Sequence, residues 1–216
     1  MSQQEGLWLH VDAAFGSAVS LLDEYRGCLR GIELADSIAF DYHKWFQVPY
    51  AVGCLLVRDA ELHLETFSER KEYLAGQAVG LGSGNPWFCD FGPELSRSFL
   101  ALKVWFTFQA LGRDKIAAMV RKNLQLASDL AVLIGTVPGL ELLAPVSMNV
   151  ICLRYVPQDI ANTADTQREY IDELNRVIVT QLQLQGLAAP STTTLKECLS
   201  IRVAIVNHRT QWHHLE

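Results

Sequence analysis

Residues 36–57 read DSIAFDYHKWFQVPYAVGCLLV, and the lysine in this stretch decides how the sequence is interpreted. Most of its neighbours are apolar or aromatic, and Lys44 lies directly between His43 and Trp45. A lysine in such surroundings costs free energy unless a partner compensates its charge, or unless its pKa falls and the amine becomes a neutral nucleophile. The stretch therefore predicts either an ion pair or a reactive amine at position 44.

Short apolar segments suggest a sheet around this lysine. Residues 7–14, 35–41 and 51–59 read as strands, and residues 18–31 read as a helix that ends at Gly31. Short apolar strands separated by helical stretches are typical of an α/β fold with a mainly parallel sheet. We expect the third strand, which contains VGCLLV, to be buried on both faces.

The sequence changes character over residues 60–93, which include the glycine-rich stretch GQAVGLGSGNPWFCDFGP. A loop of this length in a compact domain is usually functional or mobile. Residues 93–112 then read as a helix with Pro93 in its first turn and Gly112 at its end. Its predicted apolar stripe consists of Leu95, Phe99, Leu102, Phe106 and Leu111.

The remaining residues predict a small α+β unit with the order helix, two strands, helix, strand. We expect these elements at about residues 113–135, 139–145, 147–157, 166–185 and 197–208. The sequence therefore predicts two domains, 1–110 and 111–216.

Composition excludes several classes of protein. A net charge of −6 argues against nucleic acid as a main partner, and no apolar run is long enough to cross a membrane. The first ten residues do not resemble a signal peptide. The five cysteines form no C-x-x-C pair and the histidines show no metal-ligand spacing, so we expect buried free thiols, no metal and a cytoplasmic protein.

Asp12, in HVDAA, is a candidate partner for Lys44. It follows the first predicted strand, and ligand contacts gather at the carboxyl ends of strands in open α/β sheets. The plainer interpretation is that Asp12 caps the next helix. If Asp12 and Lys44 share one crevice, they form either a buried ion pair, which stabilises little, or a Schiff-base lysine with an acidic partner.

Other motifs are weak by themselves. GLGSGN lacks the Lys-Ser/Thr of a phosphate loop, and DFG has no kinase catalytic loop with it. Tyr73 reads as an ordinary half-buried tyrosine, and Arg97, expected on the first turns of the 93–112 helix, reads as half of a surface salt bridge.

Taken together, WLHVDAAFG, GIELADSIAFDYHKW and LSRSFLALKVWF closely resemble the group II pyridoxal-phosphate (PLP)-dependent decarboxylases, in order and in spacing. SIRVAIVNHRT resembles the last strand of that family, so the resemblance covers nearly the whole chain. The aromatic-amino-acid branch fits best, because of the LKVWF segment. The resemblance implies the fold-type I PLP fold, here the C-terminal part of a large domain followed by a small α+β domain.

The resemblance also implies roles for residues around the cofactor. Lys44 would hold PLP as a Schiff base, and Asp12 would pair with the pyridine nitrogen. Ala14 would leave room beside the ring. His43 would lie near the cofactor phosphate, and Asp41 occupies a position close to it where many members have asparagine.

Further roles concern the substrate. Tyr73 would lie on a catalytic loop and protonate the substrate α-carbon after carbon dioxide leaves, and Arg97 would support that loop. Tyr50 would line the substrate pocket, and Ser96 would lie on its specificity side. The implied reaction is decarboxylation of an L-amino acid, of the aromatic class, to its amine.

The chain departs from the family in length. Members have a long N-terminal half before HVDAA, with most phosphate contacts and a dimer segment, and a final helix after NHRT. We therefore expect a C-terminal portion that is inactive alone and exposes apolar surface that promotes self-association, in a protein that is a homodimer. Two alternatives stay open: an inactive fragment that acts through subunit association, and another fold-type I PLP lyase or aminotransferase.

Overall fold

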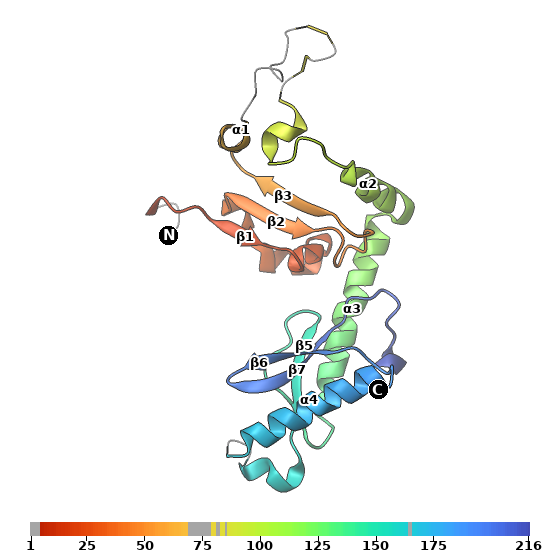
Figure 1. Cartoon of the computed structure of the whole chain (residues 1–216). Helices are drawn as coiled ribbons and strands as arrows, with labels where there is room; N and C mark the ends of the chain where they lie inside the picture. The colour runs from red at the N-terminus through yellow and green to blue at the C-terminus, as the bar shows by residue number, and fades with distance from the viewer. Residues whose placement is uncertain (1–4, 69–78, 81–82, 85, 164–165) are drawn as a thin grey trace. The chain divides into compact units, whose positions relative to one another are not determined.

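The computed structural model describes residues 5–68, 79–80, 83–84, 86–163 and 166–216 (Figure 1). The chain separates into two compact units, Met1–Ile116 and Ala117–Glu216. The domain boundary expected from the sequence, between residues 110 and 111, stays a prediction. Within the described residues, no helix is long and apolar enough to cross a membrane.

The first unit contains a three-stranded sheet in the order β1-β2-β3 (Figure 1). Strand β1 (His10–Asp12) pairs in parallel with β2 (Ser37–Asp41), as predicted. Strand β3 (Gly53–Val57) pairs with β2 in the antiparallel direction, so the prediction of a mainly parallel sheet is wrong for the third strand. Only residues 42–52 connect β2 to β3, and a parallel crossover needs a dozen residues or more.

Strand β3 is also not buried on both faces, contrary to expectation. Leu55 and Leu56 are each about half exposed. An apolar run indicates a strand that can be buried, but burial requires elements packed on both faces of the sheet.

Two predicted helices of the first unit are different in the structure. Residues 16–34 form three short 3₁₀ helices, η2 (Gly16–Leu21), η3 (Asp23–Leu29) and η4 (Ile32–Leu34), instead of one helix. Leu22 is extended between the first two, with φ −105° and ψ 116°, and Gly31 has φ 94°, which favours glycine.

The helix expected at 93–112 is α2 (Leu100–Leu111), and it begins seven residues after Pro93. The preceding segment is held outside the helix by Arg97, which donates to the carbonyl of Phe88. Most of the predicted apolar stripe is exposed, including Phe99 and Phe106. Helix α1 (Ala60–Phe67), which was not predicted, begins at Asp59, whose side chain accepts the N–H groups of Glu61 and Leu62.

The second unit agrees closely with the predicted pattern. Helix α3 (Arg113–Ile134) starts just before it, followed by β4 (Leu140–Leu142), β5 (Val150–Tyr155), η7 (Gln158–Thr163), α4 (Arg168–Leu184), β6 (Ser191–Leu195), β7 (Cys198–Ala204) and η8 (Trp212–His214). The strands form an antiparallel sheet in the order β4-β5-β7-β6. Strand β6 was missed because STTTL has no apolar alternation.

The core of the second unit is closed by α3, α4 and the sheet. It consists of Leu126, Ala127, Leu130, Ile134, Ile151, Leu153, Val179, Ile201 and Ile205. Buried Asn175 of α4 joins helix to sheet, because it bonds both the N–H and the carbonyl of Tyr155. The five cysteines are free, but Cys28 is exposed and the others are half-buried, so the expectation of buried thiols is wrong.

Candidate active site

The candidate site lies at the carboxyl ends of the two parallel strands. Asp12 is the last residue of β1 and Asp41 is the last residue of β2, and Asp12 is in register with Ala39. Lys44 follows three residues after Asp41. The parallel pairing therefore brings both carboxylates and the lysine to one edge of the sheet, where open α/β folds bind ligands.

Lys44 has an ion-pair partner in the structure. Its Nζ lies 2.7 Å from Oδ2 of Asp41, and its side chain is 42% exposed. This hydrogen bond raises the pKa of Lys44 above its ordinary value, against the opposing effect of partial desolvation, and the charges of Asp41, Asp12 and Tyr50 act in the same direction as the bond. The structure therefore pairs Lys44 with Asp41, three residues away, and the role of Lys44 as a Schiff-base lysine stays a prediction.

Asp12 shapes the turn that follows β1. Its Oδ1 accepts the N–H of Ala14 at 3.0 Å. The expected helix cap is not formed, because η2 begins after Phe15 without a side-chain cap. The carboxylate is exposed and close enough to Lys44 to affect its pKa. Asp12 and Ala14 thus belong to one short turn at the end of β1.

Aromatic side chains next to Lys44 pack away from it into the unit. Trp45 and Phe46 are almost fully buried, and the indole of Trp45 stacks on Phe15 with ring centroids 5.2 Å apart. Phe46 also contacts the ring of Tyr42, and Phe108 of α2 meets both. The apolar residues around Lys44 therefore anchor its loop, while the amine itself reaches solvent.

His43 and Tyr50 pack against each other in the same loop. The Nδ1 atom of His43 lies 2.9 Å from the carbonyl oxygen of Val52 and 3.0 Å from its nitrogen, so the Val52 backbone fixes the ring. The ring of Tyr50, which is 82% exposed, meets the imidazole edge-on with centroids 4.3 Å apart. An exposed aromatic ring at this place can contact a ligand bound near Lys44.

Lys103 is a residue of this region that the sequence did not reveal. From α2 its Nζ donates to the carbonyls of Tyr50 and Ala51, at 3.2 and 3.3 Å. It therefore ties the helix to the loop that carries Lys44. Its only signal in the sequence was a cation within the otherwise apolar LALKVWF segment.

The remaining predicted residues lie elsewhere or outside the described part. Arg97 donates to the carbonyl of Phe88 at 3.1 Å and lies 3.9 Å from Glu94. These contacts tie it to Phe88, near the end of the glycine-rich stretch, and to Glu94 just after that stretch, and they do not reach the Lys44 group. Ser96 is exposed on the same loop, and Tyr73 lies outside the described residues. The roles of all three stay predictions.

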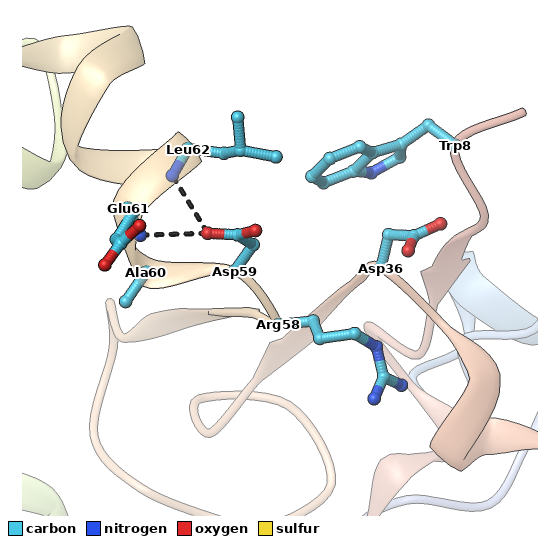
Figure 2. Close-up of a pocket in the computed structure, with 7 residues that line it drawn as sticks. All are labelled: Trp8, Asp36, Arg58, Asp59, Ala60, Glu61 and Leu62. Carbon is cyan, nitrogen blue, oxygen red and sulfur yellow. Dashed lines mark hydrogen bonds between the residues drawn. The ribbon is translucent and has the colours of Figure 1, made fainter. Parts of the chain in front are cut away.

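A pocket of about 490 Å³ lies at the opposite edge of the sheet (Figure 2). Asp36 comes just before β2 and Arg58 just after β3, so in this antiparallel pair both mark the edge away from Lys44. Figure 2 shows the indole of Trp8 across from Leu62 over the hollow. Its polar groups serve the fold: Arg58 donates to Ala35, and Asp36 accepts the N–H of Leu9. This pocket is therefore not the site around Lys44.

A lysine amine close to a carboxylate is the combination that PLP enzymes use, with the lysine as the Schiff base and the carboxylate as partner of the pyridine nitrogen. Residues 1–156 match the family described as the pyridoxal-dependent decarboxylase conserved domain. The chain belongs to this family, which confirms the resemblance seen in its motifs.

Relatives and solved structures agree with this assignment. The chain is 34% identical over 97% of its length to an aromatic-L-amino-acid decarboxylase of Bacillus atrophaeus, and 30% identical over 96% to an L-2,4-diaminobutyrate decarboxylase of Acinetobacter baumannii. It spans 42% and 39% of those proteins.

The structure of Oryza sativa TDC with PLP and tryptamine matches 99% of this chain and 43% of that one, with a TM-score of 0.88 and 26% identity. This match confirms the predicted fold class. The chain thus spans about two fifths of the length of the relatives that it matches.

Proposed function

We propose that this chain is the lysine-bearing part of a PLP-dependent decarboxylase that converts an L-amino acid, of the aromatic class, to its amine and carbon dioxide. The observation that carries the proposal is the Lys44 amine beside the Asp12 and Asp41 carboxylates at one sheet edge. The aromatic class is supported by the Bacillus atrophaeus relative, which is more similar to this chain than the diaminobutyrate enzyme is.

The described residues fit two parts of PLP. A primary amine that is partly exposed can bind the aldehyde carbon, and a carboxylate on the neighbouring strand can pair with a protonated ring nitrogen. Lys44 would supply the first group and Asp12 the second. Bound there, PLP would supply a ring that accepts the electron pair of the bond to the leaving carboxylate.

The chain's own residues would perform the remaining tasks. Lys44 would release and recapture the cofactor through Nζ, and the Asp12 carboxylate would hold a proton at the ring nitrogen. Tyr50, exposed beside His43, would offer an aromatic contact to the substrate side chain. Tyr73 would donate the proton to the substrate α-carbon, as the family resemblance implies.

Assembly is part of the proposal. Helix α2 exposes Leu102, Trp105 and Phe106, and Phe99 just before it is also exposed. Exposed apolar patches of this kind mark interaction sites, so we propose that the protein is a homodimer. We also propose that it resides in the cytoplasm, and its five free cysteines support this location. Sedimentation velocity of the chain and of a Trp105→Ser/Phe106→Ser variant measures this association. A wild-type chain that sediments as a monomer would contradict self-association through this surface.

The experiment that tests the cofactor site is covalent trapping. The chain is incubated with PLP and reduced with borohydride, and the modified lysine is mapped by mass spectrometry. Selective labelling at Lys44, lost in Lys44→Arg, is expected. Arginine keeps the cation that pairs with Asp41 but cannot form the Schiff base, so the fold is retained.

A matched control is Lys115→Arg, which replaces an exposed lysine at the start of α3 and should leave the labelling of Lys44 unchanged. Scattered labelling that is equal in the Lys44→Arg variant would contradict a cofactor site in this chain. Retained self-association with scattered labelling would favour the alternative of an inactive fragment that acts by association. Transamination products from the whole enzyme would favour the other alternative.

A further inference from the structure

Asp41 is built into a fixed position relative to Lys44. It ends β2 and lies in register with Gly53, the first residue of β3. A Cβ atom at position 53 would lie 3.2 Å from Oδ1 of Asp41, which is tighter than nine in ten real Cβ contacts. The absence of a side chain at Gly53 therefore gives the Asp41 carboxylate the space from which Oδ2 reaches Lys44 at 2.7 Å.

The charged and titratable groups that face Lys44 are mostly acidic. Asp41 from β2 makes the direct contact, while Asp12 from the end of β1 and Tyr50 from the loop act at longer range. The Nδ1 atom of His43 lies 4.0 Å from Oδ1 of Asp41, which is not the carboxylate oxygen that Lys44 contacts. Lys103 of α2 is engaged with the backbone carbonyls of Tyr50 and Ala51.

We propose that Asp41 is a positioning residue that keeps the Lys44 amine in its ammonium form and thereby restrains its addition to an aldehyde. An ammonium group has no lone pair, so it must first lose a proton to solvent. The neutral amine then adds to the aldehyde carbon, and loss of one water leaves the carbon–nitrogen double bond. Asp41 opposes the first of these steps, because its negative charge is best compensated by the protonated amine.

This restraint has a chemical use at an accessible lysine. The amine is 42% exposed, and a neutral amine there would react with any small aldehyde in solution. A ligand that displaces Asp41 from Lys44 would remove this stabilisation of the ammonium form and release the amine for reaction. As a step in cofactor capture this inference rests on the proposed function, but the test below contains no cofactor.

The test is competitive labelling of the whole chain with trace acetic anhydride from about pH 7 to about pH 11, a range that spans lysine titration. Mass spectrometry gives the rate at Lys44 relative to Lys122 of the second unit, which serves as an internal reference. Asp41→Asn removes the charge and keeps the size. Asp41→Glu restores the charge, and Asp59→Asn removes a charge at the other edge of the sheet, where asparagine caps α1 equally well.

At about pH 9, Asp41→Asn should raise the relative labelling of Lys44 on the order of three- to tenfold, allowing for solvent screening. Asp41→Glu should return the profile toward that of the wild type, and Asp59→Asn should not change it. An Asp41→Asn profile that matches the wild type would overturn the proposal, while the covalent trapping of PLP would be unaffected by that result.

A second measurement does not depend on the folding of any variant. In the wild-type chain, raising salt from about 0.05 M to about 1 M screens an exposed ion pair and should increase the relative labelling of Lys44. Relative labelling that does not change with salt would count against control of the amine by Asp41.

Discussion

The two units differ in how completely they bury their apolar residues. In the second unit, helices α3 and α4 close a core over the sheet, and Ile151 and Ile171 have no exposed surface. In the first unit, the small core around Trp45 is accompanied by many exposed large apolar side chains. Among the described residues these include Trp8, Tyr50, Leu55, Leu56, Phe88, Phe99, Trp105 and Phe106.

This difference between the units matches the location of the candidate site. The unit with the more open surface is the one that carries Lys44, Asp12 and Asp41 at its sheet edge. Binding sites need accessible groups, while a closed core mainly provides stability. Because more of its large apolar side chains are exposed, the first unit should gain more stability than the second from packing against a partner.

The largest expected effect comes from truncating matched strand residues in the two units. Ile151→Ala in β5 removes a fully buried side chain and should cost about 2–5 kcal/mol of unfolding free energy. Leu56→Ala in β3, where the leucine is 53% exposed, should cost less than about 1 kcal/mol. Denaturant unfolding measures both values. Equal losses would mean that β3 is covered in solution and would break the comparison.

A polar contact inside the second unit should have an intermediate effect. Asn175→Ala leaves the N–H and carbonyl of Tyr155 without their side-chain partner and should cost about 1–3 kcal/mol. Thr180→Ala, five residues later on the same helix and exposed, removes one hydrogen bond to the carbonyl of Arg176 and serves as the control. If both variants melt at the wild-type temperature, α4 is not held to the sheet by Asn175.

The smallest expected effect is a difference in alkaline stability between the units. Burial raises the pKa of Tyr42 and of the Cys54 thiol, and the bond to Asp41 raises that of Lys44. All three belong to the first unit. Groups whose pKa is higher in the folded state contribute stability that is complete below their unfolded pKa and is lost as pH rises through the folded pKa.

Stability of the first unit should therefore start to fall near the ordinary pKa of cysteine, 9.0, and decrease further above that of lysine, 10.5. Amide hydrogen exchange of peptides from β2 and from β5, followed across this range, separates the two units. Exchange that accelerates equally in both would show that these three groups do not distinguish them.

Much of the fold could be predicted from sequence periodicity. The α3 helix and the strands β5 and β7 have clear apolar patterns, and they formed where expected. The direction of β3 was wrong because an apolar run looks the same in a parallel and an antiparallel strand. The short 42–52 connection carried the missing information, since it leaves no room for a crossover helix.

The site was predictable where it depends on the positions of strand ends in the sequence. The ends of β1 and β2 placed Asp12 and Lys44 at one edge, as the parallel pairing implies. The three-residue spacing of Asp41 and Lys44 was visible, but its ion pair depends on how the 42–52 turn closes. The contact of Lys103 with Tyr50 joins residues 53 apart, and no pattern in the sequence indicates such a pairing.

The short connection between β2 and β3 also has a consequence for the order of assembly. Pairing of these neighbouring strands closes a small loop, which is entropically cheap and fast, and it already brings Asp41 next to Lys44. Asp12 arrives only with the parallel pairing of β1, across a longer loop. Lys44 and Asp41 can thus come together on an early hairpin, before the Asp12 carboxylate joins the site.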